Sequence, residues 1–443
     1  MDISKDIPTS KWKRGLSGGK TAARMSRKAL QYLVRKPFLT EEKRLEAKTT
    51  MNRESAALLF EGLSLLRGTA LKMAQLLSME LDVFPPEITK ELRKSYHEVP
   101  PINRALIRKI MQNALGKPPE RIFQSFEPSA FAAASLGQVH RATTRDGRRL
   151  AVKIQYPGIR ETIQNDVQLL RSVLRPLPEY RMIIPAIEEI EMRLLEETDY
   201  GRELENMAFF RARLNMERVV VPSPCGDFSA DTVLSAEHLD GRTLNEWLKT
   251  GPPLKERELI AQTLHDLFIF GLYRLHRIHA DPNPGNFIIG GDKKIGLVDF
   301  GCVKRFDPGF VALYGKLPQT ALQGSRDDYM RLLKALRIAG QTMPAEVEDR
   351  MFEVFHETGQ WLGELYREEC FDFKAHPDFI ATGKRMMLQA IELRKHMHIN
   401  TNFIFLHRTR YGLLRLFEQM GARVCFRNPY EHSSSVFEGH EEV

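Results

Sequence analysis

Apolar residues recur at intervals of three and four along most of the chain, and this spacing predicts helices. Residues 52–115 carry the pattern in three segments separated by proline-containing breaks: AALLFEGLSLLRGTALKMAQLLSMEL, ITKELRKSYHEV and NRALIRKIMQNAL. An acid-rich helical region follows at 159–215, and ELIAQTLHDLFIFGLYRLHRIH predicts a long, largely apolar helix. Beyond residue 305 the pattern is again mostly helical. Most of the molecule is therefore expected to be helical.

The period changes to two in LGQVHRATTRDGRRLAVKIQY, at residues 136–156, and this change predicts two strands. The Asp146-Gly147 pair between them is a strong signal for a hairpin turn. Farther along, DTVLSAEHLDGRTLNEWL predicts a strand that leads through a glycine turn into a helix. The order of helices, a small sheet and a larger helical part predicts an α+β fold.

The stretch at 278–301, IHADPNPGNFIIGGDKKIGLVDFG, places two aspartates and an asparagine among turn-forming Pro and Gly residues. An Asp followed five residues later by an Asn, with another Asp beyond a short pair of strands, is an arrangement that phosphoryl-transfer enzymes use. Carboxylate and amide oxygens suit Mg²⁺. We therefore predict Asn286 and Asp299 as magnesium ligands and Asp281 as the base or positioner of the nucleophile. Each residue taken alone is more often a turn or cap residue, whereas the full spaced set favours the magnesium site.

A magnesium–nucleotide site also needs a lysine at the phosphates, and LAVKIQY supplies Lys153 between strand-forming apolar residues. A lysine in a largely buried strand requires a charge partner. Glu161 is near in sequence, and the segment EETDYGRELEN offers four further acids: Glu197, Asp199, Glu203 and Glu205. Spacing does not choose among them.

The segment PSAFAAASLGQVH stands where a phosphate-covering loop is expected, and it carries alanines where kinases carry glycines. Because alanine does not readily adopt positive φ, this loop is predicted to be stiffer than a glycine-rich one. ATP and Mg²⁺ are the predicted cofactors, and adenine should contact the backbone near Glu237 to Leu239. The predicted nucleotide contacts are Ala132, Ala133, Ala134, Ser135, Lys153, Glu237 and Leu239.

Positive charge is concentrated at one end of the chain. The 443 residues have a formal net charge of +8, and residues 1–50 alone hold thirteen Lys or Arg against five Asp or Glu. Aromatic and aliphatic residues lie among these cations, so this leader could form a basic amphipathic segment on an anionic lipid surface. A solvated basic tail is an equal alternative. Asp2 and Asp6 argue against a transit peptide, and the residues show no secretory-signal pattern.

The four cysteines, Cys225, Cys302, Cys370 and Cys425, are far apart and form no CxxC pair. They predict neither a disulfide framework nor a zinc site, and a reducing compartment fits best. No apolar run approaches the roughly 20 residues that a membrane span needs. We therefore expect a cytoplasmic protein that meets a membrane, if at all, at its surface.

Together these motifs resemble one family, the UbiB or AarF family of atypical kinase-like proteins. The resemblance covers residues 55–310 and rests on AAASLGQVH, AVKIQYPG, ETDYGRELEN, HADPNPGNF and DFG. A sixth match is a helix motif of the form Lys-x-Gly-Gln, which this chain carries as Lys72-Met73-Ala74-Gln75. Ala74 replaces the family's glycine and adds a methyl group where this helix would pack on the nucleotide lobe.

The resemblance implies a bilobal protein-kinase-like fold with a small β-containing N-lobe, a helical C-lobe and an added N-terminal helical extension. It also implies that Lys153 is the phosphate lysine and that Glu203 is its partner. Four residues would form a regulatory lid that limits access by large substrates: Lys72, Gln75, Glu197 and Asp199. The predicted boundaries are 1–50 for the basic leader, 51–115 for the helical extension, 116–240 for the N-lobe and 241–443 for the C-lobe.

The resemblance further implies an ATP-using atypical kinase or ATPase that acts on, or is regulated by, a small lipid-related molecule and supports isoprenoid quinone (ubiquinone-type) biosynthesis. Expected partners are a nucleotide, lipid or quinone precursors and an anionic membrane surface, and no nucleic acid is expected. A nucleotide-binding scaffold with little catalysis is one alternative. A conventional protein kinase is another. Against it, the chain passes soon after Gly301 to the predicted helix DPGFVALYGKLPQTAL, without a long activation segment or an Ala-Pro-Glu motif.

Overall fold

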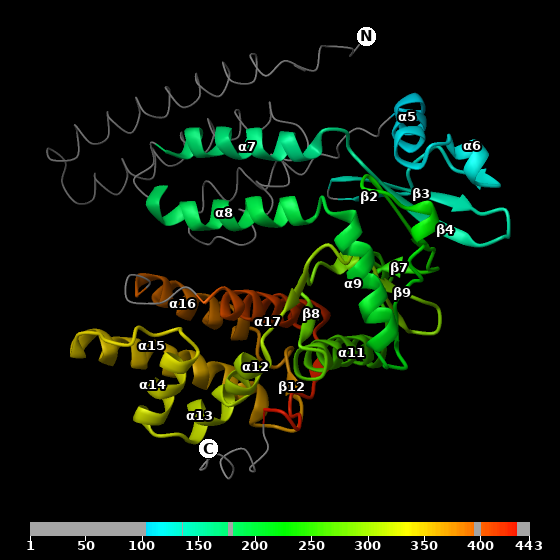
Figure 1. The fold of residues 1–443 in the computed structure, drawn as a ribbon. Helices are drawn as coiled ribbons and strands as arrows, with labels where there is room; N and C mark the ends of the chain where they lie inside the picture. The colour runs from blue at the N-terminus through cyan, green and yellow to red at the C-terminus, as the bar shows by residue number, and fades with distance from the viewer. Residues whose placement is uncertain (1–102, 135, 176–179, 394–399, 432–443) are drawn as a thin grey trace, which may run out of the picture. The chain divides into compact units, whose positions relative to one another are not determined.

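The computed structural model describes residues 103–134, 136–175, 180–393 and 400–431. The predicted leader, the predicted helix with Lys72 and Gln75, and Ser135 lie outside these ranges. The described chain divides into two compact units (Figure 1). One holds the described residues up to Arg202 together with Cys225–His238. The other holds Glu203–Pro224 and the described residues from Leu239 onward.

The first unit is built on an antiparallel sheet with the order β1-β3-β4-β6, in which β2 pairs with the start of β3 on the same edge as β1. The two longest strands are the predicted hairpin, and Gly147 in its turn has a φ of +86°. In β4 the alternation buries Leu150, Val152 and Ile154 on one face. The strands are β1 (Ser125–Phe126), β2 (Ala132–Ala134), β3 (Gly137–Thr143), β4 (Arg149–Gln155) and β6 (Val233–Glu237).

Two helices cover the apolar face of this sheet. Ile107 and Met111 of α5 (Arg104–Leu115) pack with Phe123, which follows α6 (Pro119–Ile122), and with the buried side chains of β4. Asn103 caps α5 by accepting a hydrogen bond from the backbone N–H of Leu106, as N-cap residues commonly do. This packing uses one stripe of the helix that the three-and-four spacing predicted.

The acid-rich region at 159–215 forms three helices: α7 (Ile159–Leu174), α8 (Tyr180–Glu196) and α9 (Tyr200–Arg213). α7 and α8 lie side by side (Figure 1), and Arg171 of the first forms an ion pair with Glu191 of the second at 2.9 Å. Before the last strand of the sheet, Gly226–Phe228 forms a short 3₁₀ turn, η2.

The second unit contains α9 from Glu203 onward, long helices and three small sheets. One sheet has the order β5-β10-β9-β7, and another pairs β8 with β11 in antiparallel fashion. The strands are β5 (Val219–Val220), β7 (Arg242–Thr243), β8 (Arg277–His279), β9 (Phe287–Ile289), β10 (Ile295–Leu297), β11 (Val303–Arg305), β12 (Phe371–Asp372) and β13 (Arg423–Val424). The 3₁₀ turn η3 (Pro284–Asn286) precedes β9.

The chain after residue 305 is mostly helical, as its pattern predicts. α11 (Leu254–Tyr273) forms much of the core of this unit and packs against α17 (Thr401–Met420). Asp307 caps α12 by accepting hydrogen bonds from the backbone N–H groups of Gly309 and Phe310. The other helices are α10 (Leu244–Lys249), α12 (Pro308–Gly315), α13 (Leu317–Gln323), α14 (Arg326–Ala335), α15 (Ala345–Gly363), η4 (Glu364–Tyr366) and α16 (Phe379–Glu392).

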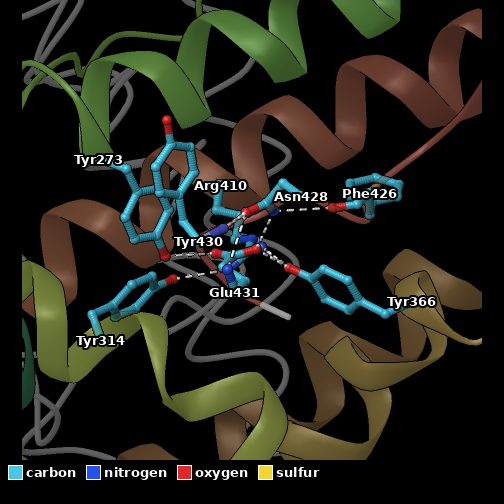
Figure 2. Close-up of polar contacts among 8 residues, drawn as sticks. All are labelled: Tyr273, Tyr314, Tyr366, Arg410, Phe426, Asn428, Tyr430 and Glu431. Atoms are coloured by element: carbon cyan, nitrogen blue, oxygen red, sulfur yellow. Dashed lines mark hydrogen bonds and ion pairs between the residues drawn. The ribbon is translucent and has the colours of Figure 1, made fainter. Parts of the chain in front are cut away.

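A buried ion pair joins α17 to the end of the described chain (Figure 2). A guanidinium nitrogen of Arg410 lies 3.1 Å from a carboxylate oxygen of Glu431, and both side chains are almost completely buried. Hydroxyl donors from Tyr273 and Tyr366 complete the shell of the carboxylate at 2.9 and 2.5 Å. Burial alone would raise the pKa of Glu431, but Arg410 and these hydrogen bonds lower it to about 2.

The cysteine prediction is wrong in one respect, because Cys370 and Cys425 form a disulfide. The ladder of β12 and β13 pairs Phe371 with Val424, which places the two cysteines opposite each other with their Cα atoms 3.9 Å apart. A separation of 55 residues carries no signal of this pairing. The cysteine pattern therefore no longer favours a reducing compartment. Among the described residues, no helix is both long and apolar enough to cross a membrane.

Candidate functional site

The alanine run forms a strand rather than a loop. Ala132, Ala133 and Ala134 pair with Val139, Gln138 and Gly137 of β3. This pairing holds the backbone of the run against β3, and its greater stiffness than a glycine-rich loop stays a prediction. On its other side Gly137 pairs with β4, where a Cβ would lie 2.2 Å from the carbonyl oxygen of Ile154, so only glycine fits there without a backbone shift. Sequence reasoning did not single out Gly137, although it is the one glycine in the segment.

Lys153 lies on β4, on the face opposite Val152 and Ile154, and is half-buried. Its Nζ is 5.2 Å from the centroid of the Tyr200 ring, which is itself buried at the first residue of α9. An ammonium over an aromatic face is a stabilising arrangement that also restricts the side chain. Tyr200 was missed by sequence reasoning, although it lies inside ETDYGRELEN beside the acids that were weighed.

Glu197 and Asp199 lie in the short link between α8 and α9. Asp199 is exposed, and its carboxylate accepts a hydrogen bond from the backbone N–H of Arg202 at 2.9 Å, as a helix cap does. The link is tied to the sheet because Gln155 donates to the carbonyl of Thr198 at 3.0 Å. The facing of this acidic pair with Lys72 and Gln75 stays a prediction, since that helix lies outside the described residues.

An open cavity of about 400 Å³ adjoins this link within the first unit. Charged residues dominate its lining, with two apolar side chains from α8. The lining residues are Arg160, Glu188, Glu191, Met192, Leu195, Glu196, Asp199 and Arg202.

The predicted adenine contacts lie at the end of β6. Glu237 is paired with Leu150 and is exposed, and the next residue, His238, donates its backbone N–H to the carbonyl of Arg149. Leu239 belongs to the second unit, where a Cβ on Gly296 would approach its side chain to 2.6 Å. A role for Glu237 and Leu239 in binding adenine stays a prediction.

In the second unit, α9 binds the residue after Asp299 through two side chains. The Glu203 carboxylate accepts the backbone N–H of Phe300 at 3.2 Å, and the Asn206 amide donates to the Phe300 carbonyl at 3.1 Å. Both side chains are buried. Asn206 was not predicted, but it follows Glu203 by three residues, the spacing that places two helical side chains on one face. The pairing of Glu203 with Lys153 stays a prediction.

The predicted catalytic loop brings Asp281 and Asn286 together. The amide nitrogen of Asn286 donates to a carboxylate oxygen of Asp281 at 2.8 Å, and Asn286 is buried. Since the amide nitrogen is used in this bond, the amide oxygen is the group left to act as a ligand. The turn itself is fixed by Asn283, whose side chain accepts the backbone N–H of Gly285.

Asp299 is held in an unusual backbone conformation, with a φ of +64°. Its carbonyl oxygen accepts a hydrogen bond from Nε2 of His279 at 2.7 Å, and its carboxylate accepts the backbone N–H of Gly301 at 3.3 Å. The Phe300 ring is fully buried and packs against His279 and Phe210, with ring centroids 5.7 and 5.6 Å away. His279 is a further residue that sequence reasoning did not single out, although it stands two positions before Asp281.

The chemistry of these donors fits magnesium. Asn286 offers an amide oxygen and Asp299 a carboxylate, which are the hard oxygen ligands that Mg²⁺ takes. Within the described ranges, no three His, Cys, Asp or Glu side chains cluster to form a complete metal site. A magnesium ion held by Asn286 and Asp299 would therefore complete its shell with water and phosphate oxygens, as it does in nucleotide sites.

Comparison with known proteins shows what the chain is similar to. It is 31% identical over 272 residues to the Dictyostelium discoideum protein named probable serine/threonine-protein kinase abkA, covering 58% of this chain and 48% of that protein. It is 30% identical over 332 residues to the mitochondrial atypical kinase coq-8 of Caenorhabditis elegans, covering 70% and 42%. The chain thus spans about half the length of the curated relatives it matches.

A solved structure is similar over most of the chain. It is the complex of Rv3197 with erythromycin from Mycobacterium tuberculosis, with a TM-score of 0.57 and 26% sequence identity, covering 86% of this chain and 96% of that one. The family model described as the ABC1 atypical kinase-like domain matches residues 94–333. That match takes in the sheet of the first unit and the loops that carry Asp281, Asn286 and Asp299. The mixed α/β architecture is kinase-like, and the chain belongs to the ABC1 (UbiB/AarF) family of atypical kinase-like proteins.

Proposed function

We propose that this protein is a magnesium- and ATP-dependent atypical kinase-like enzyme or ATPase that acts on, or is regulated by, a small lipid-related molecule. The observation that supports this most is the hydrogen bond from the Asn286 amide to the Asp281 carboxylate, together with the contact that holds the backbone carbonyl of Asp299 on His279. The Asp299 carboxylate in turn accepts the backbone N–H of Gly301. Such preorganisation is what a phosphoryl-transfer site needs, since positioning and charge stabilisation supply most of its catalysis.

Each predicted site residue has its own role in the proposed phosphoryl transfer. Bound MgATP would supply the phosphoryl group and the metal that neutralises its charge. Asn286 and Asp299 hold the metal, and Lys153, restrained by the Tyr200 ring, binds the phosphates. Asp281 keeps one carboxylate oxygen on the Asn286 amide and orients the nucleophile, water or a substrate hydroxyl, with the other.

A small substrate or regulator is favoured over a protein substrate. β11 begins two residues after Gly301, and α12 begins at Pro308. This short connection contains no long segment on which a peptide could dock. The family resemblance supports a role in isoprenoid quinone biosynthesis, and the Caenorhabditis elegans relative is named a mitochondrial atypical kinase. We therefore propose lipid or quinone precursors as the acceptor or the activator.

The test is ADP release from MgATP, measured with and without anionic lipid and quinone precursors, together with a search for a phosphorylated product. Asp281→Asn should keep nucleotide binding but slow ADP release by about a hundredfold or more, because a positioned general base typically contributes at least that factor. Asp292→Asn is the matched control, because Asp292 is an exposed turn residue outside the site.

Two results would oppose the proposal. Equal ADP release by Asp281→Asn and the parent would remove Asp281 from the chemistry. Stabilisation of the parent by MgATP without ADP release under any condition would leave a nucleotide-binding scaffold instead.

A further inference from the structure

In the second unit, two arginines lie over one aromatic ring, and a third lies opposite one of them on the paired strand. Arg213 is the last residue of α9, and Arg277 is the first residue of β8. Their guanidinium carbons lie 4.6 and 3.9 Å from the centroid of the Phe209 ring. Arg305, the last residue of β11, is the direct partner of Arg277 in the β8–β11 ladder. We call Arg213, Arg277 and Arg305 the arginine cluster.

Among the described residues, no carboxylate forms an ion pair with any of these three guanidinium groups. Arg213 and Arg305 are exposed, and Arg277 is half-buried. The pKa of Arg277 is lowered by its partial burial and by the charges of Arg305 and Arg213, and no carboxylate is among the causes. Like charges placed directly opposite each other on paired strands destabilise the pair. The fold therefore holds three cations together at a cost.

The geometry suits a compact oxyanion. A guanidinium that lies face-on over a ring keeps the N–H groups in its own plane available for other acceptors. The two guanidinium groups over the Phe209 ring and the third cation, on the strand paired with β8, are near enough for the charges of Arg213 and Arg305 to lower the pKa of Arg277. A phosphate group offers several oxygens and at least one negative charge, and arginine binds it through two parallel hydrogen bonds.

We propose that the arginine cluster is a binding site for a phosphate-bearing anion, distinct from the nucleotide site. The proposal does not depend on the proposed function, because none of the three arginines was assigned a part in it. Neither hydrophobic periodicity nor motif spacing indicates the cluster, since its members are brought together only when α9 packs beside the β8–β11 pair.

The position of the cluster links it to the predicted metal ligand. β8 leads from Arg277 to His279, about 7 Å along the strand by its regular rise, and His279 binds the carbonyl of Asp299. β11 begins two residues after Gly301 and ends at Arg305. An anion that bridges Arg277 and Arg305 would neutralise the repulsion between the two strands. It would thereby stabilise the segment that holds Asp299.

The first experiment titrates the full chain with inorganic phosphate and follows binding by calorimetry, with and without saturating MgADP. Phosphate binding that persists when MgADP is present is assigned to the arginine cluster. The double variant Arg277→Gln/Arg305→Gln should bind phosphate about tenfold more weakly or worse, since each charge-assisted hydrogen bond typically contributes more than a factor of ten. Arg277→Lys keeps the charge but loses the planar fork, so an intermediate affinity is expected.

The control is Arg350→Gln, which removes one positive charge from an exposed arginine that forms an ion pair with Glu353 on α15. It should bind phosphate like the parent. Phosphate affinity in the double variant equal to that of the parent would overturn the proposal, as would a parent that binds no phosphate once MgADP is present.

A second readout separates binding from folding. Arg305 has no ring or acid contact among the described residues, so Arg305→Gln should melt at the same temperature as the parent or higher in phosphate-free buffer, because it relieves repulsion on Arg277. The parent should gain thermal stability from phosphate, and the variant should gain much less. A variant that melts lower without phosphate and gains as much from it would contradict the inference.

The phosphate could be carried by a lipid headgroup or by a free compound, and flotation distinguishes these sources. The parent and the double variant are mixed with vesicles of phosphatidylcholine alone and with phosphatidylglycerol added; the leader is present in both proteins. Weaker recovery of the double variant only on the anionic vesicles assigns a lipid headgroup. Equal recovery, with phosphate affinity still lost in solution, assigns a soluble phosphate compound. No difference in either assay rejects the site.

Discussion

Asp299 adopts a left-handed backbone conformation that is unusual for a residue with a Cβ, and four neighbours hold it there. His279 binds its carbonyl, Glu203 and Asn206 bind the next peptide group, and Gly301 donates to its carboxylate. Strained residues persist only where the surroundings determine them strongly, and they concentrate at functional sites. The strain at Asp299 is thus consistent with its proposed role as a metal ligand.

Asp299→Asn should abolish the stabilisation of the protein by MgATP while leaving its fold intact. Asparagine has the same shape and tolerates left-handed φ, but it would leave two neutral amides where the proposed site has one carboxylate and one amide. The measurement is the melting temperature with and without MgATP. Asp292→Asn, which alters an exposed turn, should respond like the parent. A full MgATP response in Asp299→Asn would show that this carboxylate does not bind the metal.

How much of the site could be predicted differs from residue to residue. Asp281 and Asn286 are five residues apart in one loop, so their contact follows from local sequence. Tyr200, Asn206 and His279 have structural partners that come from distant segments, and no local pattern reports such contacts. The side chains that hold the predicted site residues in place are therefore the ones that could not be predicted from the sequence.

At the level of elements, long periodic segments were predictable and short strands were not. The β3–β4 hairpin has seven residues on each side and a local turn, so its alternation could be recognised. β8, β11, β12 and β13 have two or three residues each and pair with distant strands. Two residues cannot show a period, which is why the disulfide between Cys370 and Cys425 was missed.

Gly137→Ala should destabilise the first unit by about 3 kcal/mol, a cost at the upper end of that usually found for overpacking. The added methyl group would meet the backbone carbonyl of Ile154 at 2.2 Å, and a backbone atom in the middle of a sheet cannot move aside cheaply. Urea unfolding measures the change. Gly226→Ala in the same unit meets no atom within 4 Å and should lie within about 0.5 kcal/mol of the parent. Equal urea midpoints for Gly137→Ala and Gly226→Ala would contradict the close approach of Gly137 to the Ile154 carbonyl.

Stability of the second unit should fall steeply in acid. The pKa of Glu431 is lowered to about 2 because Arg410 and hydroxyl donors outweigh its burial, while burial beside Arg410 lowers the pKa of His265 to about 4 and of His407 to about 3. In each case the unfolded chain binds the proton more readily than the folded one. The stability is complete above the unfolded histidine pKa near 6.5, and it is lost progressively as the pH falls toward 2.

Denaturant unfolding at a series of pH values measures this loss. Glu431→Gln should cost about 3–5 kcal/mol at neutral pH, because it leaves Arg410 buried without a counter-charge. It should also remove the share of the pH dependence that comes from the carboxylate, at pH values between its unfolded pKa near 4.3 and its folded pKa of about 2, while the share of His265 and His407 persists. Glu353→Gln, which breaks an exposed pair with Arg350, should change stability by less than about 1 kcal/mol. A free energy of unfolding that does not fall in acid in the parent would contradict the lowered pKa values of Glu431, His265 and His407.

For the whole molecule, the decisive feature is the separation of charge along the chain. The formal net charge is +8, and residues 1–50 account for all of it, so the rest of the chain is balanced. These residues lie outside the described ranges, and their role rests on sequence alone. A chain without residues 1–50 should float less with vesicles containing phosphatidylglycerol, because each basic residue near an anionic surface contributes about 1 kcal/mol. Added salt should weaken recovery of the full chain in the same way. Unchanged recovery of the shortened chain would assign the leader to solvent and leave the arginine cluster as the remaining route to an anionic membrane.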